Sequence, residues 1–172
     1  YKIDEISETE TRERYIDLVI ENEGWTIGED CMPEVEISGV STPSGKGKAD
    51  YVLYGDNGVP LAVIEAKKLD IDPMTGKNQA KEYADALEKK YGVRPVIFFT
   101  NGLDYYIWDD LNYPERQVSS IYSKKDLEKL IFRRGNRKSL KNISTDIKDE
   151  ITNRVYQKEA VIRVTEALEK GY

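Results

Sequence analysis

The sequence predicts an α/β fold in which a central β-sheet lies between helices, with a helical extension at the C-terminal end. Segments with strand character follow helical segments along residues 7–109, and a further helical pattern closes the chain. The 172 residues are 39% hydrophobic and 34% charged, which is enough for one sizeable core. No apolar run is long enough to cross a membrane, so no membrane partner is expected.

The predicted elements are, in order, a helix at 7–23, strands at 34–40, 48–54 and 59–68, a helix at 74–92, and strands at 94–100 and 104–109. In the first helix, Glu10 follows Ser7 at capping-box spacing. An apolar stripe on one side of this helix consists of Tyr15, Ile16, Leu18, Val19 and Ile20. The run at 59–68 is almost continuously apolar, which is typical of a strand in the middle of a sheet. We therefore expect the hairpin of the second and third strands near the middle of the sheet.

Residue usage restricts the chemistry that the chain can perform. There is no histidine, which removes the commonest general base and metal ligand. Cys31 is the single cysteine, so no internal disulfide can form, which fits a reducing cytoplasm. Catalysis would have to use carboxylates, lysine, hydroxyl groups or a hard metal ion.

The net charge of −6 argues by itself against a nucleic-acid partner, but the charge is unevenly distributed. Residues 123–141 are strongly basic and could contact phosphate. A solvated basic helix with its following loop is the alternative interpretation of this segment. The candidate DNA-binding residues in it are Arg133, Arg134, Arg137 and Lys138.

Charged residues end the third predicted strand, in the sequence AVIEAKK at 62–68. Side chains alternate along a strand, so Leu61, Val63, Glu65 and Lys67 are predicted to share one face. Asp50 lies at a comparable distance on the other side of the hairpin turn. Two carboxylates held together favour a cation between them, and Mg²⁺ prefers oxygen ligands. The pattern suits metal-dependent phosphodiester hydrolysis, and a solvated strand end is the alternative.

The string KADYVLYGDNGVPLAVIEAKK resembles the nuclease core of the PD-(D/E)xK superfamily, and more narrowly the N-terminal nuclease domain of type I restriction enzyme motor (R) subunits. The resemblance implies a restriction-endonuclease-like central mixed β-sheet flanked by helices. It implies that Asp50, Glu65 and the Ala66 backbone carbonyl bind Mg²⁺ and that Lys67 serves the attacking water. Ala49 stands where the motif has its proline, a common departure.

The next helix carries a Q-x-x-x-Y pair, Gln79 and Tyr83, which the same family also has. The two residues share a helical face. Their implied role is to contact DNA or to support the metal site. A half-buried helix face with a polar edge is the alternative for this pair.

The opening helix, SETETRERYIDLVIENEGW, resembles that of the same family. A helical wheel turns Glu8 and Arg12 toward the core and Glu10 outward. Glu8 is therefore a candidate metal ligand or support, with Arg12 steadying it. A buried ion pair between Glu8 and Arg12 is the equally weighted alternative.

The tail RVYQKEAVIRVTEAL resembles the entry to the helicase motor of these subunits, where a glutamine reads adenine, a role that would fall on Gln157. No phosphate-binding loop follows, so ATP would bind only to the full-length protein. The predicted division is a nuclease domain at 1–150 and the start of a truncated motor domain at 151–172.

The resemblance implies a Mg²⁺-dependent endonuclease acting on duplex DNA, with the methyltransferase and specificity subunits of a restriction complex as partners. The setting would be cytoplasmic, and the fragment alone would be inactive or weak. A stand-alone repair or junction nuclease is one alternative. A non-catalytic module that clamps DNA or docks subunits is the other.

Overall fold

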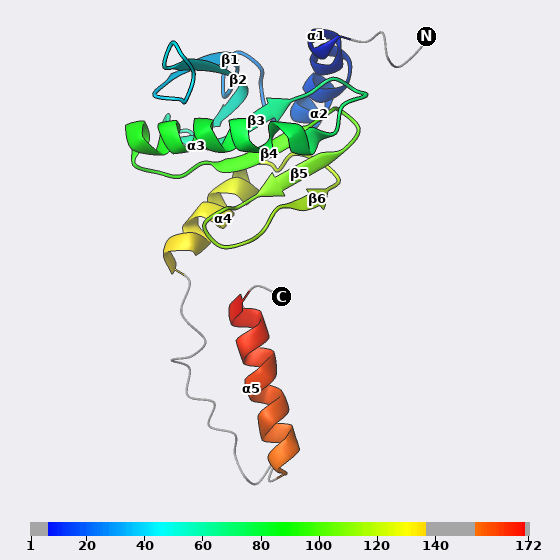
Figure 1. Ribbon diagram of the computed structural model, residues 1–172, viewed down its shortest axis with the longest axis vertical. Coiled ribbons are helices and arrows are strands. Elements are labelled where there is room, and N and C mark those ends of the chain that lie inside the picture. Colours follow the sequence, from blue (N-terminus) through cyan, green and yellow to red (C-terminus); the bar gives the residue numbers. More distant parts are fainter. Residues whose placement is uncertain (1–6, 137–153, 171–172) are drawn as a thin grey trace. The chain divides into compact units, whose positions relative to one another are not determined.

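The computed structural model describes residues 7–136 and 154–170, and its centre is a six-stranded sheet with the order β1-β2-β3-β4-β5-β6 (Figure 1). β3 and β4 pair in parallel, and the other neighbours pair antiparallel. The strands are β1 (Cys31–Ser38), β2 (Lys46–Tyr54), β3 (Pro60–Ala66), β4 (Val96–Thr100), β5 (Tyr105–Trp108) and β6 (Arg116–Val118). The β2–β3 hairpin lies near the middle of the sheet, as predicted.

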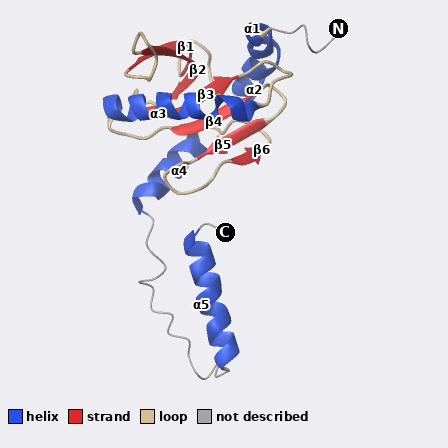
Figure 2. Cartoon of the chain, in the orientation of Figure 1, coloured by secondary structure: helices blue, strands red, loops and turns tan. Residues whose placement is uncertain are grey.

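The helices are α1 (Glu8–Thr11), α2 (Asp17–Asn22), α3 (Lys77–Tyr91), α4 (Lys124–Asn136) and α5 (Val155–Lys170) (Figure 2). A π-helical segment, η2 (Arg12–Ile16), joins α1 to α2, and a 3-10 turn, η3 (Pro73–Gly76), leads into α3. The predicted capping box is present, because the Ser7 hydroxyl and the Glu10 side chain each accept the other residue's backbone N–H. Leu18, at the edge of the predicted apolar stripe, is 56% exposed.

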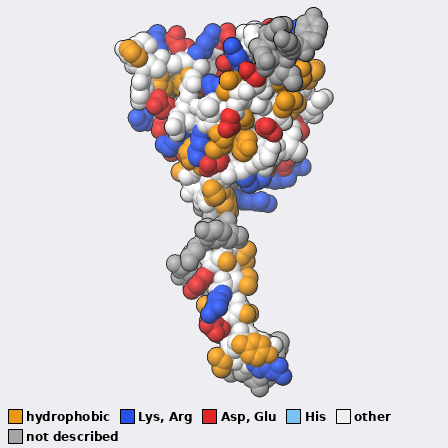
Figure 3. All heavy atoms as spheres, turned by 45° about the vertical axis from the view of Figure 1, so that its right-hand side comes forward, with side chains coloured by type: hydrophobic (Ala, Val, Ile, Leu, Met, Phe, Trp, Pro, Cys, Tyr) orange, Lys and Arg blue, Asp and Glu red, His pale blue; other side chains and the backbone are white. Residues whose placement is uncertain are grey.

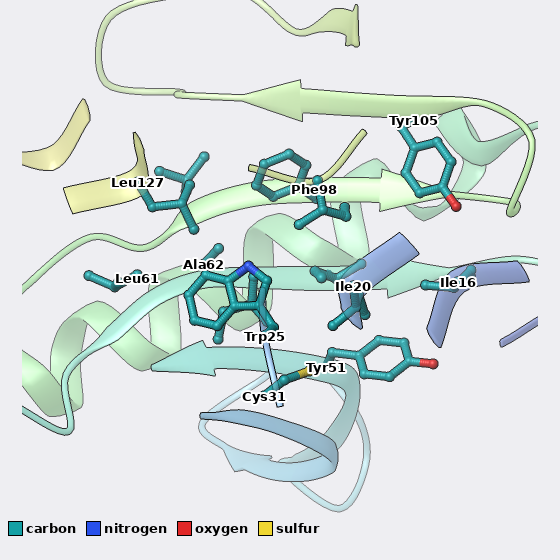
Figure 4. Packing of buried hydrophobic residues seen from close by; sticks show 14 of the residues in the cluster. Ile16, Ile20, Trp25, Cys31, Tyr51, Leu61, Ala62, Phe98, Tyr105 and Leu127 are labelled. Carbon is teal, nitrogen blue, oxygen red and sulfur yellow. The ribbon is translucent and has the colours of Figure 1, made fainter. Parts of the chain in front are cut away.

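Two hydrophobic clusters hold the sheet between the helices. On one face, Ala80, Ala84 and Leu87 of α3 pack against Val63 and neighbouring strand residues. On the other face the core contains residues from the N-terminal helical segment, from α4 and from the strands (Figure 4). The residues labelled there are Ile16, Ile20, Trp25, Cys31, Tyr51, Leu61, Ala62, Phe98, Tyr105 and Leu127. Every residue of β3 is buried, which accounts for its nearly continuous apolar sequence.

The prediction that Leu61 shares a face with Val63 is wrong. Leu53 pairs with Ala62 and Tyr54 pairs with Pro60, so Leu61 is the extra residue of a β-bulge. Leu61 therefore packs on the face opposite α3, with Ala62. The alternation is regular beyond the bulge, where Val63 lies on the α3 face and Ile64 on the other.

The prediction that the strand at 104–109 is the last one is also wrong, because β6 adds a further strand to that edge of the sheet. β6 has three residues, of which only Val118 is apolar. So short a segment carries no periodic signal in the sequence.

The chain divides into two compact units, Tyr1–Phe132 and Arg133–Tyr172. The predicted domain boundary at residue 150 lies outside the described residues. In the second unit, α5 exposes apolar side chains, including Val155, Ile162 and Leu168 (Figure 3). Among the described residues, no helix is both long and apolar enough to span a bilayer.

Candidate active site at the end of the β2–β3 hairpin

The carboxylate of Asp50 is held between two donors at the point where β2 and β3 stop pairing through their backbones. The Ala66 N–H donates to Asp50 Oδ2 at 2.7 Å, and Arg12 Nη1 donates to Oδ1 at 3.1 Å. The first bond takes the place of a backbone bond between the two strands. Asp50 is thereby fixed directly to β3, next to Glu65.

The alternation of β2 side chains between the two faces of the sheet is interrupted at Asp50. Ala49 and Val52 pack in the α3-side cluster, while Tyr51 packs in the opposite cluster, so strict alternation is broken between residues 49 and 51. In β1, Glu34 lies between the residues that pair with Ala49 and Tyr51, and it has a φ of 54°. A left-handed backbone is unfavourable for a residue with a Cβ, and such strain is found where the surroundings impose it. The irregularity turns the Asp50 carboxylate toward Ala66.

Glu65 and Lys67 emerge on the α3 face of β3, as the sequence predicted. Lys67 Nζ lies 2.6 Å from Glu65 Oε1, and Glu65 is only 2% exposed. Gly76, at the start of α3, closes over this pair, because an added Cβ would lie 2.9 Å from Glu65 Cγ. Within the described part of the chain, Glu65 Oε2 is buried and has no hydrogen-bond partner.

Burial raises the pKa of Glu65 to about 7, and the neighbouring Asp50 carboxylate adds to the rise while Lys67 opposes it. Burial likewise raises the pKa of Asp50, against the lowering effects of the Ala66 N–H and of Arg12. Burial is the largest effect on the pKa of Lys67 and lowers it. The hydrogen bond to Glu65 and the nearby charges of Glu65, Glu8 and Asp50 together outweigh burial, so the pKa is raised overall. Lys67 is therefore an ammonium ion at neutral pH, suited to orienting a nucleophile or stabilising negative charge.

A chain of hydrogen bonds connects Lys67 to α3 and back to β2. Lys67 Nζ donates to Gln79 Oε1 at 3.3 Å, and Gln79 Nε2 donates to the Tyr83 hydroxyl at 2.8 Å. The same hydroxyl accepts the Lys48 backbone N–H at 3.3 Å. Gly47 leaves room for the ring, since an added Cβ would lie 2.6 Å from Tyr83 Cε1. Hydrogen bonds thus link the predicted pair to Lys67.

The alternative in which Arg12 forms an ion pair with Glu8 is not what the described residues show. Arg12 instead bridges Asp50 and Glu34, with Nη2 at 3.0 Å from Glu34 Oε1. Glu8 is near enough for its charge to act on Asp50 and Glu65. However, no three His, Cys, Asp or Glu side chains of the described residues form a group that could hold a metal ion.

The residues present nevertheless fit a Mg²⁺ ion. In the part of the chain that the structure describes, the buried Glu65 Oε2 accepts no hydrogen bond and lies near the Asp50 carboxylate, a situation that a cation would relieve. The N–H and C=O of one strand residue point to the same side, so the Ala66 carbonyl also faces Asp50. Two carboxylates and one carbonyl leave the remaining positions to water, as Mg²⁺ commonly requires.

Arg133, Arg134 and Gln157 belong to the second compact unit, whereas the site described above belongs to the first. Arg133 and Arg134 lie in α4, and Gln157 is exposed in α5. Arg137 and Lys138 lie outside the described residues. Sequence reasoning missed Glu34 and Lys48, which pair with each other at 2.9 Å beside Arg12. Lys48 is the first residue of the string that resembles the nuclease core, but the resemblance implies no role for it, and Glu34 belongs to no recognisable motif.

A family model, a curated relative and a solved structure that resemble this chain all come from type I restriction enzymes. Residues 30–116 match the family described as type I restriction enzyme R protein N terminus. Over 67 residues, 39% of this chain and 8% of the relative, the sequence is 43% identical to the type I restriction enzyme EcoAI endonuclease subunit of Escherichia coli. The fold is similar to a fragment described as an HsdR subunit of a type I restriction enzyme from Vibrio vulnificus, with a TM-score of 0.62 at 21% identity. That match covers 79% of this chain and 27% of the other, so the chain spans only a small part of either relative.

Proposed function

Because the chain belongs to the family of type I restriction enzyme R protein N termini, we propose that it is the endonuclease domain of such a subunit. Its reaction is Mg²⁺-dependent hydrolysis of phosphodiester bonds in duplex DNA. The observation that carries the proposal is the buried Glu65 Oε2, which lies beside Asp50 and Lys67 and has no hydrogen-bond partner among the described residues.

Asp50, Glu65 and the Ala66 carbonyl would hold the ion at the end of the hairpin. Bound Mg²⁺ would supply Lewis-acid polarisation of the phosphate and a water molecule with a lowered pKa. Lys67, as an ammonium ion, orients the attacking water or stabilises the negative charge that grows on the phosphate. Gln79 and Tyr83 keep the Lys67 side chain in place through their hydrogen bonds.

A module that only clamps DNA or docks other subunits explains the site less well. An ionised Glu65 costs stability, because its pKa is raised to about 7 by burial. A purely structural module would gain by replacing that carboxylate with an apolar side chain. The presence of this unfavourable group favours a catalytic role, because active sites are commonly less stable than their surroundings could be.

The net charge of −6 favours a low intrinsic affinity of this domain for DNA. Cleavage would therefore depend on the ATP-driven motor of the full-length subunit, which brings DNA to this domain. The methyltransferase and specificity subunits would supply site recognition, and the complex would act in the cytoplasm. A stand-alone repair nuclease would lack this dependence.

The test uses the full-length subunit assembled with its partner subunits and a plasmid that carries the recognition site. Lys67→Ala is compared with Lys68→Ala, the exposed neighbour at the end of the same strand. Lys67→Ala should lower ATP-dependent cleavage at least about 100-fold while ATP hydrolysis persists. Lys68→Ala should cut at nearly the wild-type rate. Normal cleavage by Lys67→Ala would overturn the assignment of the site.

A further inference from the structure

Arg12 occupies a position beside Asp50 that a metal ion would also seek. Its guanidinium group donates to Asp50 Oδ1 at 3.1 Å through Nη1. Both side chains are largely shielded from water, with exposed fractions of 14% and 13%. Asp50 therefore has a cationic partner that belongs to the chain itself.

Each acid of the site already has one cationic partner. Arg12 pairs with Asp50, and Lys67 pairs with Glu65. A divalent cation that enters beside Asp50 meets the positive guanidinium group of Arg12 nearby, and like charges repel strongly at short distance in a partly buried site. The ion and Arg12 thus compete for the same carboxylate.

Glu34 offers Arg12 a second anchor that does not belong to the site. Glu34 Oε1 accepts from Arg12 Nη2 at 3.0 Å, and its Oε2 accepts from Lys48 at 2.9 Å. Glu34 has a strained φ of 54°, and its side chain is 49% exposed. Because Nη1 and Nη2 are bound to different acids, Arg12 can release Asp50 and remain attached to Glu34.

We propose that Arg12 is an internal cation that competes with the metal ion for Asp50, and that Glu34 retains the guanidinium group when the ion enters. Arg12 is thus a positioning residue that sets how readily the site loads with metal. This inference rests on the proposed metal site. A purely structural ion pair between the first helix and the sheet would instead affect stability without opposing metal binding.

The test is calorimetric titration of the 172-residue chain with Mn²⁺ and with Mg²⁺. Arg12→Gln should bind the ion about tenfold more tightly than the wild type, since it removes the competing charge. The matched control is Arg14→Gln, because Arg14 lies on the same helical segment but pairs with Glu10 at the surface. Its affinity should stay within about twofold of the wild type. Adding Asp50→Asn to Arg12→Gln should abolish the gain.

A second measurement needs no substitution. In the wild-type chain, the NMR signal of the Arg12 side-chain N–H groups should shift during the Mg²⁺ titration, while that of Arg14 should not. Metal binding that depends on Asp50 but is no tighter in Arg12→Gln, with an unmoved Arg12 signal, would overturn the inference and leave the proposed nuclease site intact. Absence of metal binding in every variant, Arg12→Gln included, would overturn both.

Discussion

The backbone N–H of Ala66 donates to the side chain of Asp50 at 2.7 Å, so a carboxylate takes over a position that backbone groups occupy elsewhere between β2 and β3. The same carboxylate is the proposed metal ligand. Two substitutions of Asp50 distinguish its structural role from its role in metal binding.

Asp50→Ala should leave the Ala66 N–H unsatisfied in a largely buried position and lower the free energy of unfolding by about 1–3 kcal/mol. Asp50→Asn keeps an oxygen that can accept this bond, so it should cost less than about 1 kcal/mol. Both variants should lose calorimetrically detectable Mn²⁺ binding. Urea unfolding gives the stabilities, and equal losses in the two variants would contradict the role assigned to the Ala66 bond.

Glu65→Gln should stabilise the chain at pH 8. The pKa of Glu65 is raised from 4.5 to about 7, so the ionised carboxylate disfavours the folded state above pH 7 and the penalty fades as the pH falls toward 4.5. Removal of the charge should therefore raise the free energy of unfolding by about 1–3 kcal/mol at pH 8 and have little effect near pH 4.5. Urea unfolding across this range measures the effect. The exposed Glu21→Gln is the control, and a gain that grows as the pH falls would refute the assignment.

Gly76→Ala should damage the site and the fold together. The new methyl group would lie 2.9 Å from Glu65 Cγ and 3.1 Å from Lys67 Cε, closer than ordinary contacts allow. The expected loss is about 1–3 kcal/mol of stability, with cleavage by the full-length enzyme reduced at least tenfold. Gly135→Ala in α4 is the matched control, because a Cβ there meets nothing within 4 Å and should be neutral or slightly stabilising. Similar unfolding curves for the two variants would contradict the packing described around Glu65.

Cys31 should be inert toward thiol reagents in the folded chain. Its side chain is fully buried, and burial raises the pKa of the thiol to about 12. At pH 8 the reactive thiolate is therefore scarce as well as inaccessible. Labelling should proceed only after unfolding by denaturant, and rapid labelling of the native chain would show that this region opens readily.

The parts of the fold that the sequence predicted are those with strong local patterns. The apolar run at 59–68 predicted β3, and the turn before it predicted the β2–β3 hairpin. The assignment of Glu65 and Lys67 to one face followed from strand alternation. β6 was missed because three mostly polar residues pair only through the context of the sheet.

The wrong or missing predictions around the site arise from local backbone irregularities that cannot be predicted from residue types. The bulge at Leu61 shifts that residue to the other face. Glutamate is not a residue that predicts a left-handed backbone, so the conformation of Glu34 could not be expected. Its carboxylate, which was not predicted to belong near the site, pairs with Arg12. The helical wheel turned Arg12 inward correctly, but its partner depends on tertiary contact with β1 and β2.

Because β3 is buried on both faces, the geometry of the site should persist through local opening of the chain. The backbone amides of a strand that is third of six and covered by two cores exchange with solvent deuterium chiefly when the whole unit unfolds. The amide of Ala66 belongs to that group, although its acceptor is a side chain. The spacing of Asp50 and Glu65 should thus last as long as the native state itself. Heat or denaturant would then remove the geometry of the site only by melting the domain.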